Sequence, residues 1–222
     1  MLSHTKPVLG KDMERTTDHQ HLANWLDRDI WPQIQTMMGH DALFKLLGYA
    51  RKLTGGFNGP IGWLIDVEYL VYQMIAIRRL CDSRRDVISL RRLLKEAKSK
   101  GLVPNAKIID GLSGELDRCD HVCEMVSNYV AHTGDPLRRP NFSQWDLQVV
   151  HLAEAQKAVC GVAVTLDRDV LQRKNPGGII PVPQCDDFMQ EFRSWVPADG
   201  IQRLFEFWHT HRRTVNAWIP QS

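Results

Sequence analysis

The stretch Ser127-Asn128-Tyr129-Val130-Ala131-His132-Thr133-Gly134-Asp135-Pro136 closes a predicted helix. A helical pattern enters it from Leu112, and the helix must stop at Gly134, because Gly accepts the left-handed cap and the following Pro136 cannot continue a helix. His132 therefore lies in the last turn, at the negative end of the helix dipole, which favours the imidazolium form. This position suits a general acid, a phosphate contact or a simple cap of its own helix.

The pattern leading to this stretch predicts a long helical region over 107–132, interrupted at Gly111 or Gly114. Asn128 lies four residues before His132, so both are expected on the same rim of the helix, outside its apolar face. An amide beside a titratable ring suits a phosphodiester site, although the spacing also occurs by chance in many helices.

A second predicted helix, over 61–82, is apolar on nearly all sides and is therefore expected to be central and buried. It ends on Arg78, Arg79 and Asp82. Arginines at a helix C-terminus complement the dipole, and an arginine one turn before Asp82 is placed to form an ion pair that fixes the guanidinium. The preceding segment, 55–60, is rich in Gly but lacks the ending of a phosphate-binding loop, so it reads as a helix connector.

The remaining chain also consists of predicted helices separated by helix-breaking residues. Residues 1–16 read as a flexible arm, a helical bundle is expected over 17–174, and a Pro/Gly linker with a short helical extension over 175–222. An apolar stripe begins a helix at Thr17, which Pro32 kinks or splits and Gly39 ends. Ser89 caps a short helix, and 143–170 is the cleanest helical pattern. Alternating strand patterns are absent from the sequence, so the fold class is all-α, an up-and-down helical bundle.

Composition limits the class of protein. The 222 residues are 43% hydrophobic and 24% charged, which is ordinary for a globular chain, and a net charge of +2 gives no global field for nucleic acid. Local cationic patches remain, which are as well explained by solvated helix faces as by phosphate binding. They are five arginine pairs, at 78–79, 84–85, 91–92, 138–139 and 212–213.

The five cysteines and the N-terminal sequence indicate in which cellular compartment the protein is expected. An odd number of thiols within apolar helical patterns, without a second pair at zinc-finger spacing, indicates reduced cysteines and no metal site. His209 and His211 are two apart and so do not face each other on a helix, which makes them a poor metal pair. The N-terminus lacks signal-peptide features, and no apolar run approaches the ~20 residues of a membrane span. We therefore expect a cytoplasmic protein without a cofactor and without membrane association.

Three short motifs, in order along an all-α chain, resemble the HEPN superfamily and most closely its AbiU-like branch, which is associated with abortive phage infection. They are Arg79-Leu80-Cys81-Asp82, Ile88-Ser89-Leu90-Arg91-Arg92-Leu93-Leu94 and Tyr129-Val130-Ala131-His132-Thr133. The resemblance covers about 61–172. It implies a helical bundle that is commonly a homodimer, and in active members a metal-independent endoribonuclease of a phage-defence or toxin–antitoxin type, with an antitoxin or regulatory protein as partner.

The sequence departs from the family at one catalytic position. His132 matches the final histidine of the signature and Asn128 its polar position, but Met125, Val126 and Ser127 stand where the arginine belongs. Cleavage through the 2′-hydroxyl needs a base, an acid and a cation for the charge on the phosphate.

Two hypotheses follow from this departure, beside a helical protein of other ancestry. In the first, His132 transfers protons, Asn128 orients the phosphate or the ring, and Arg79 with Asp82 supplies charge and positioning for RNA cleavage or binding. In the second, the chain is a non-catalytic, dimeric interaction module or a nucleotide- or RNA-binding module.

Overall fold

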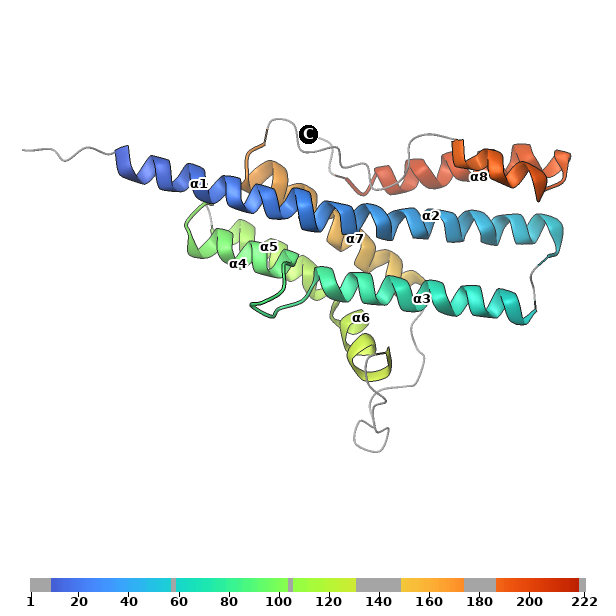
Figure 1. Ribbon diagram of the computed structural model, residues 1–222, viewed down its shortest axis with the longest axis horizontal. Coiled ribbons are helices and arrows are strands. Elements are labelled where there is room, and N and C mark those ends of the chain that lie inside the picture. The colour runs from blue at the N-terminus through green and yellow to red at the C-terminus, as the bar shows by residue number, and fades with distance from the viewer. Residues whose placement is uncertain (1–8, 57–58, 104–105, 131–148, 174–186, 220–222) are drawn as a thin grey trace, which may run out of the picture.

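The computed structural model describes residues 9–56, 59–103, 106–130, 149–173 and 187–219, and within these ranges the chain is helical without strands (Figure 1). The predicted all-α bundle is confirmed. The helices, with π-helical and 3-10 segments marked η, are α1 (Leu9–Trp25), η1 (Leu26–Ile30), α2 (Trp31–Thr54), α3 (Pro60–Leu80), α4 (Leu90–Ser99), α5 (Ala106–Asp117), α6 (Asp120–Met125), η2 (Val126–Val130), α7 (Val149–Thr165), η4 (Leu166–Val170), η5 (Asp187–Ser194) and α8 (Ala198–Asn216).

The first three segments form one rod along the long axis of the molecule. Figure 1 shows α3 running back beside α2, α4 and α5 near α1, and α8 along the opposite side of α2. Helix α7 crosses behind α2 and α3 and contacts both of them. This arrangement leaves α2 in the middle of the bundle.

The rod begins earlier and is less interrupted than the sequence predicts. Helix α1 starts at Leu9, not at Thr17, and Pro32 lies in the first turn of α2, directly after the π-helical segment η1, so it interrupts the α-helical bonding without ending the rod. The predicted break at Gly39 is wrong, because α2 continues through it to Thr54. Glycine lowers helix stability by only ~1 kcal/mol, which the burial of neighbours such as Met37 and Met38 outweighs.

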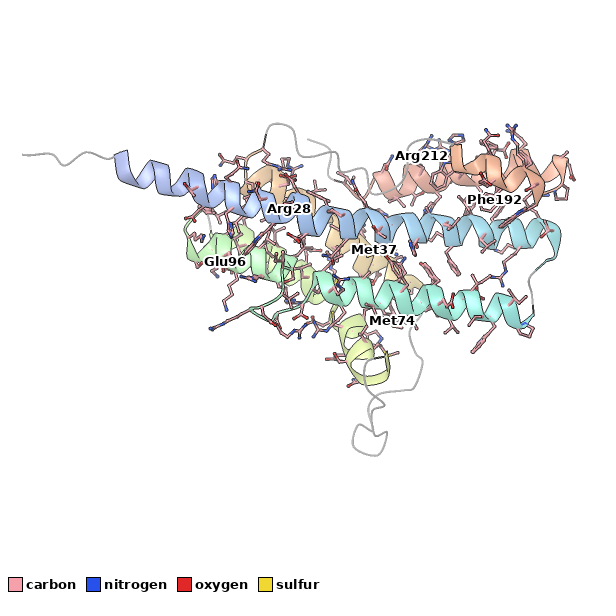
Figure 2. All side chains as sticks on the ribbon, in the orientation of Figure 1. Arg28, Met37, Met74, Glu96, Phe192 and Arg212 are labelled. Carbon is pink, nitrogen blue, oxygen red and sulfur yellow. The ribbon has the colours of Figure 1, made fainter. Side chains whose placement is uncertain are left out.

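The core lies between α2, α4, α5 and α7. The apolar stripe predicted for the rod is buried, with Leu22, Leu26, Ile30, Ile34 and Met37 all fully inaccessible. Figure 2 labels Met37 on α2 and Met74 on the facing helix α3, and both side chains belong to this core. The predicted cap is also confirmed, since the Ser89 hydroxyl accepts a hydrogen bond from the Arg92 amide at 3.2 Å and begins α4.

Two further predictions are corrected by the helix ends. The region after 106 breaks at Arg118 and Cys119, between α5 and α6, and not at Gly111 or Gly114. The C-terminal part is a 3-10 segment and one long helix, α8, which places the fully buried Leu204 and Trp208 among the core residues. The linker over 175–186 lies outside the described residues.

Helix α3 differs most from its prediction. It was expected to be buried on all sides, yet Ile61, Trp63, Leu64 and Ile75 are exposed at 60%, 66%, 49% and 40%. By length and composition, α3 and the segment Val149–Val170 are also apolar enough to span a membrane, a test that the core helix of a globular protein passes equally well. The expectation that no segment approaches that length is therefore corrected. The α7 segment is explained by its burial, whereas the exposed apolar face of α3 needs another explanation.

Candidate functional site: a groove between α2 and α3

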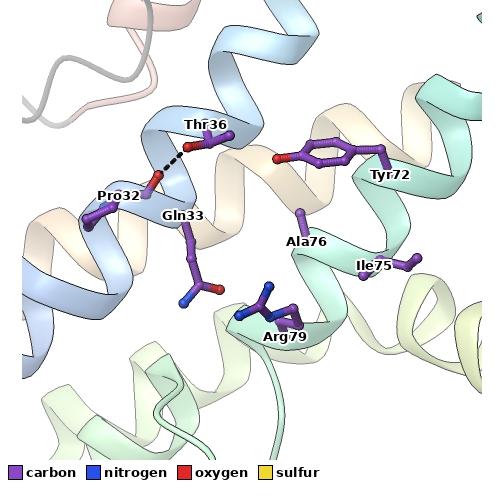
Figure 3. A pocket seen from close by; sticks show the side chains of 7 residues that line it. All are labelled: Pro32, Gln33, Thr36, Tyr72, Ile75, Ala76 and Arg79. Atoms are coloured by element: carbon purple, nitrogen blue, oxygen red, sulfur yellow. Dashed lines mark hydrogen bonds between the residues drawn. The ribbon is translucent and has the colours of Figure 1, made fainter.

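Two adjoining pockets form a groove along the face that α2 and α3 share. The larger, of about 420 Å³, is lined by His40, Leu43, Phe44, Leu47, Ile65, Glu68, Tyr69 and Tyr72. The smaller, of about 260 Å³, is lined by Pro32, Gln33, Thr36, Tyr72, Ile75, Ala76 and Arg79 (Figure 3). Tyr72 lines both pockets, so they make one continuous surface with aromatic rings in the middle and Arg79 at one end.

Stacked rings from the two helices form the middle of the groove. The Phe44 and Tyr69 rings are nearly parallel, with centroids 3.7 Å apart, and the His40 and Tyr72 rings stack at 4.1 Å. Stacking of this kind holds side chains in one orientation and adds roughly 0.5–1.5 kcal/mol for each aromatic pair. The groove is therefore a preformed apolar surface.

The groove side of α3 follows a heptad pattern. Six residues recur in alternating steps of four and three along the helix, and each of them is exposed or lines the groove. Such a stripe is the pattern by which helices pack side by side. The six residues, called the α3 stripe below, are Ile61, Ile65, Glu68, Tyr72, Ile75 and Arg79.

The predicted pairing of Arg79 with Asp82 is wrong. Arg79 is exposed and points across the smaller pocket toward Gln33 (Figure 3), and no ion pair to it is present within the described residues. Arg79 is thus a cation of the groove, and its position does not depend on Asp82.

The carboxylate of Asp82 instead closes the turn after α3. It accepts from the Arg84 backbone at 2.9 Å and lies 3.3 Å from Arg78 and 3.1 Å from Arg84 side-chain nitrogens. Burial would raise the pKa of Asp82, but the Arg84 hydrogen bond and the two guanidinium charges outweigh it and lower the pKa. Asp82 is therefore an ionised, turn-forming residue.

Of the predicted pair Asn128 and His132, the structure describes only Asn128. Asn128 lies in the π-helical segment η2 and is only 7% exposed, so its predicted place on the helix rim is wrong. The prediction assumed α-helical spacing through Asn128. In a π-helix the hydrogen bonds join residues five apart, so side chains point in other directions than they would in an α-helix. His132 lies outside the described residues, and so does its predicted capping role.

Beneath the groove lies a buried polar network that the sequence analysis missed. The Tyr69 hydroxyl donates to Asp41 Oδ1 at 2.5 Å, Lys45 Nζ lies 2.8 Å from Asp41 Oδ2, and Gln156 Nε2 lies 3.3 Å from Asp41 Oδ1. Gln156 also donates to Gln73 at 2.9 Å. The network joins α2, α3 and α7, and it could have been suspected from the polar residues that interrupt otherwise apolar helical faces.

The network fixes the protonation of the groups around Asp41. Burial and the Asp41 charge raise the pKa of Tyr69 well above its ordinary value, so the hydroxyl stays protonated and donates a hydrogen bond to Asp41. His211, from α8, has Nε2 3.7 Å from Asp41 Oδ2, and burial with the nearby Lys45 charge lowers its pKa to about 4. His211 is therefore neutral near pH 7, and its ring is turned toward the buried Asp41. Among the described residues, no group of three or more His, Cys, Asp and Glu side chains is arranged to hold a metal ion.

Fold and site together define a class: an all-α helical bundle with an open, aromatic groove along one helical hairpin. Comparison with protein-family models, curated proteins and solved structures gives no significant match for this chain.

Proposed function

We propose that this chain is a dimeric interaction module of the HEPN-like type, in which the α2–α3 groove of one copy packs on the same groove of a second copy. The observation that carries the proposal is the exposed apolar face of α3. Isolated exposed apolar side chains are normal, but Ile61 and Ile75 are exposed on the same side of α3 as Ile65 and Tyr72, which line an apolar groove, and this combination is typical of an interaction surface. Two antiparallel helices packed on a second such pair would make a four-helix bundle.

The charges of the α3 stripe favour a second copy of the chain as the partner that binds the groove. In an antiparallel, two-fold pair of α3 helices, the register that sets Glu68 opposite the copy's Arg79 also sets Tyr72 opposite Ile75, because both pairs share one midpoint along the helix. Each contact then occurs twice, as a two-fold interface requires. Within the described residues, neither Glu68 nor Arg79 has an ion-pair partner in its own chain, so both are available.

The face approaches the size of a standard protein interface. Helix α3 has 21 residues and α2 has 24. At a rise of 1.5 Å per residue and a diameter of about 10 Å, the two helices present a face of about 30 by 20 Å, or about 600 Å² before side-chain relief is counted. A standard protein interface buries about 800 Å² on each partner, so this face approaches the required size.

The test is the oligomeric state in solution. We expect the wild-type chain to be a dimer by sedimentation equilibrium at about 0.1 mM, where a micromolar dimer is nearly complete. Ile75→Glu is expected to weaken it by about tenfold or more, because it buries a charge in the interface. Val150→Glu, an equivalent change at a valine that is 51% exposed outside the groove, should leave the dimer intact.

A charge exchange tests the register itself. Glu68→Arg and Arg79→Glu each set like charges opposite one another and should weaken the dimer, whereas the double variant should restore it. A wild-type monomer at about 0.1 mM would refute the proposal. If that monomer bound lipid vesicles or a foreign helix through the same groove, the surface would belong to that partner instead.

The second candidate is binding or cleavage of RNA, and Arg79 is the observation that favours it. An exposed guanidinium beside the Tyr72 and His40 rings offers a phosphate contact next to a stacking surface. It would also supply the cation that the His132 signature lacks. An antitoxin or regulatory protein as further partner remains a prediction from the resemblance.

The RNA candidate is tested with labelled oligonucleotides and total RNA in the presence of EDTA. Cleavage that is lost in His132→Ala and Arg79→Ala, but kept in the matched surface variant Arg118→Ala, would establish a metal-independent nuclease. Binding without cleavage, weakened by Arg79→Ala alone, would establish an RNA-binding module. No binding and no cleavage by the wild type would refute this candidate and leave the dimeric module.

A further inference from the structure

Two histidines from separate helices, His121 of α6 and His151 of α7, lie with their rings in contact. The ring centroids are 5.2 Å apart, and the ring planes are nearly perpendicular, at 80°. The two helices pack together at this point, where the Cys119 thiol donates to the Ala155 carbonyl at 3.7 Å. His121 is exposed and His151 is half-buried, so the pair is open to solvent.

We propose that His121 and His151 bind one Zn²⁺ ion, with Glu124 or Glu154 as a further ligand, and that the ion ties α6 to α7. Imidazole and carboxylate groups are common protein ligands of zinc. A site with two imidazoles disfavours Mg²⁺ and Ca²⁺, because these ions take oxygen ligands. The inference is independent of the proposed dimer and of RNA cleavage.

The separation of the two rings suits a shared ion. With Zn–N bonds of about 2.0–2.1 Å at the tetrahedral angle, the centroids of two imidazole rings on one ion lie about 5 Å apart. The observed 5.2 Å between His121 and His151 matches this spacing. The χ2 torsion of histidine is broad, so each ring can turn to aim one nitrogen at a common point without a movement of the backbone. The two helices therefore already hold the imidazoles at the spacing that zinc requires.

A carboxylate follows each histidine at the same interval. Glu124 is three residues after His121 and Glu154 is three after His151, so each lies one turn along the same helix face as its histidine. Both glutamates are exposed, and no ion pair within the described ranges engages either carboxylate. Among the described residues, no group of three or more ligands is assembled in advance. A glutamate therefore joins the site by a change of rotamer when the ion binds, and water completes the tetrahedron.

Cys123 is not expected to be a ligand of this site. It lies two residues after His121, and residues two apart on a helix do not face each other. The effect of the ion would reach beyond the pair, because α6 continues directly into η2, which holds the buried Asn128. An ion between α6 and α7 would thus also fix the segment that leads toward His132.

The experiment titrates ZnCl2 into the full-length wild-type chain, stripped of metal with EDTA and desalted, by isothermal titration calorimetry at about pH 7.5. We expect one Zn²⁺ per chain. His121→Asn and His151→Asn should each weaken zinc binding by about 100-fold or more, since changes to outer-shell partners alone cost about 10–100-fold. His209→Asn, on α8, is the matched control and should leave the affinity unchanged.

Two further titrations test the chemistry of the ligands. The double variant with Glu124→Gln and Glu154→Gln should weaken zinc binding by about tenfold or more, whereas Glu206→Gln on α8 should not. Unchanged affinity in the double variant would overturn the carboxylate ligand. The wild-type affinity should fall by about tenfold or more between pH about 7.5 and about 5.5, because a histidine binds metal only in its neutral form.

A measurement on the wild type guards against misfolded variants. In imidazole proton–nitrogen NMR spectra, the signals of two of the nine histidines should move on addition of one equivalent of ZnCl2, and they should be those of His121 and His151. The proposal is overturned if zinc does not bind, if it moves the signals of other histidines instead, or if His121→Asn and His151→Asn bind it as tightly as the wild type.

Discussion

Tyr69→Phe probes the network under the groove by removing one hydroxyl and nothing else. The lost group donates to Asp41 Oδ1 at 2.5 Å within a site where Asp41 is fully buried. A hydrogen bond to a charged group contributes about 1.5–3 kcal/mol, and removing one partner leaves the other desolvated. The remaining donor to that oxygen, Gln156, is at 3.3 Å and is a weak substitute. We therefore expect a loss of about 2–3 kcal/mol in the free energy of unfolding.

The assay is urea unfolding at one fixed protein concentration, because a dimer would make stability depend on concentration. Tyr72→Phe is the matched control: it removes the same hydroxyl from a partly buried tyrosine that lines the groove, and it should change the free energy of unfolding by less than about 0.5 kcal/mol.

Asp41→Asn and the double variant complete a cycle, in which a coupling of about 1 kcal/mol or more would show that Tyr69 acts through Asp41. The reasoning is refuted if the two tyrosine variants lose the same stability, or if Tyr69→Phe loses less than about 0.5 kcal/mol.

Two further predictions concern buried charge. Between pH about 6.5 and about 4, His211 binds a proton in the unfolded chain but stays neutral in the folded one, so the free energy of unfolding of the wild type should fall by about 2–3 kcal/mol as the pH is lowered. His211→Gln should remove this loss, and equal pH profiles of the two proteins in denaturant titrations would contradict the prediction. Arg173→Ala removes the cation 2.5 Å from the fully buried Asp167 and should lower the free energy of unfolding in urea by about 3 kcal/mol. Arg118→Ala, which breaks an exposed ion pair, should lower it by less than about 1 kcal/mol, and similar losses in both variants would show that the burial of Asp167 does not matter.

The helical class could be predicted because it depends on local patterns. Apolar residues at three- and four-residue steps and Ser89 as a cap act within a few residues of themselves, and the structure confirms them. Gly39 shows the limit of local reasoning. Its low helix propensity is visible in the sequence, but the burial of its neighbours against other helices, which is not visible there, outweighs it.

The candidate site could be predicted only in part. The sequence singled out Arg79, which does line the groove, but paired it with Asp82, which lies instead beside Arg78 and Arg84. It placed Asn128 on a rim where a π-helical turn buries it. Nothing local distinguishes a buried apolar helix from one with an open face, because exposure depends on which other helices cover it.

The sequence by itself thus determined the helices, their stripes and the residues able to carry charge. Tertiary structure alone decided that Asp41, Tyr69 and Gln156 share one buried network, and that the α3 stripe is left uncovered. The physical reason is that helix formation is a matter of neighbours in sequence, whereas burial, pKa and pairing depend on groups that only the packing of α2, α3, α6 and α7 brings together.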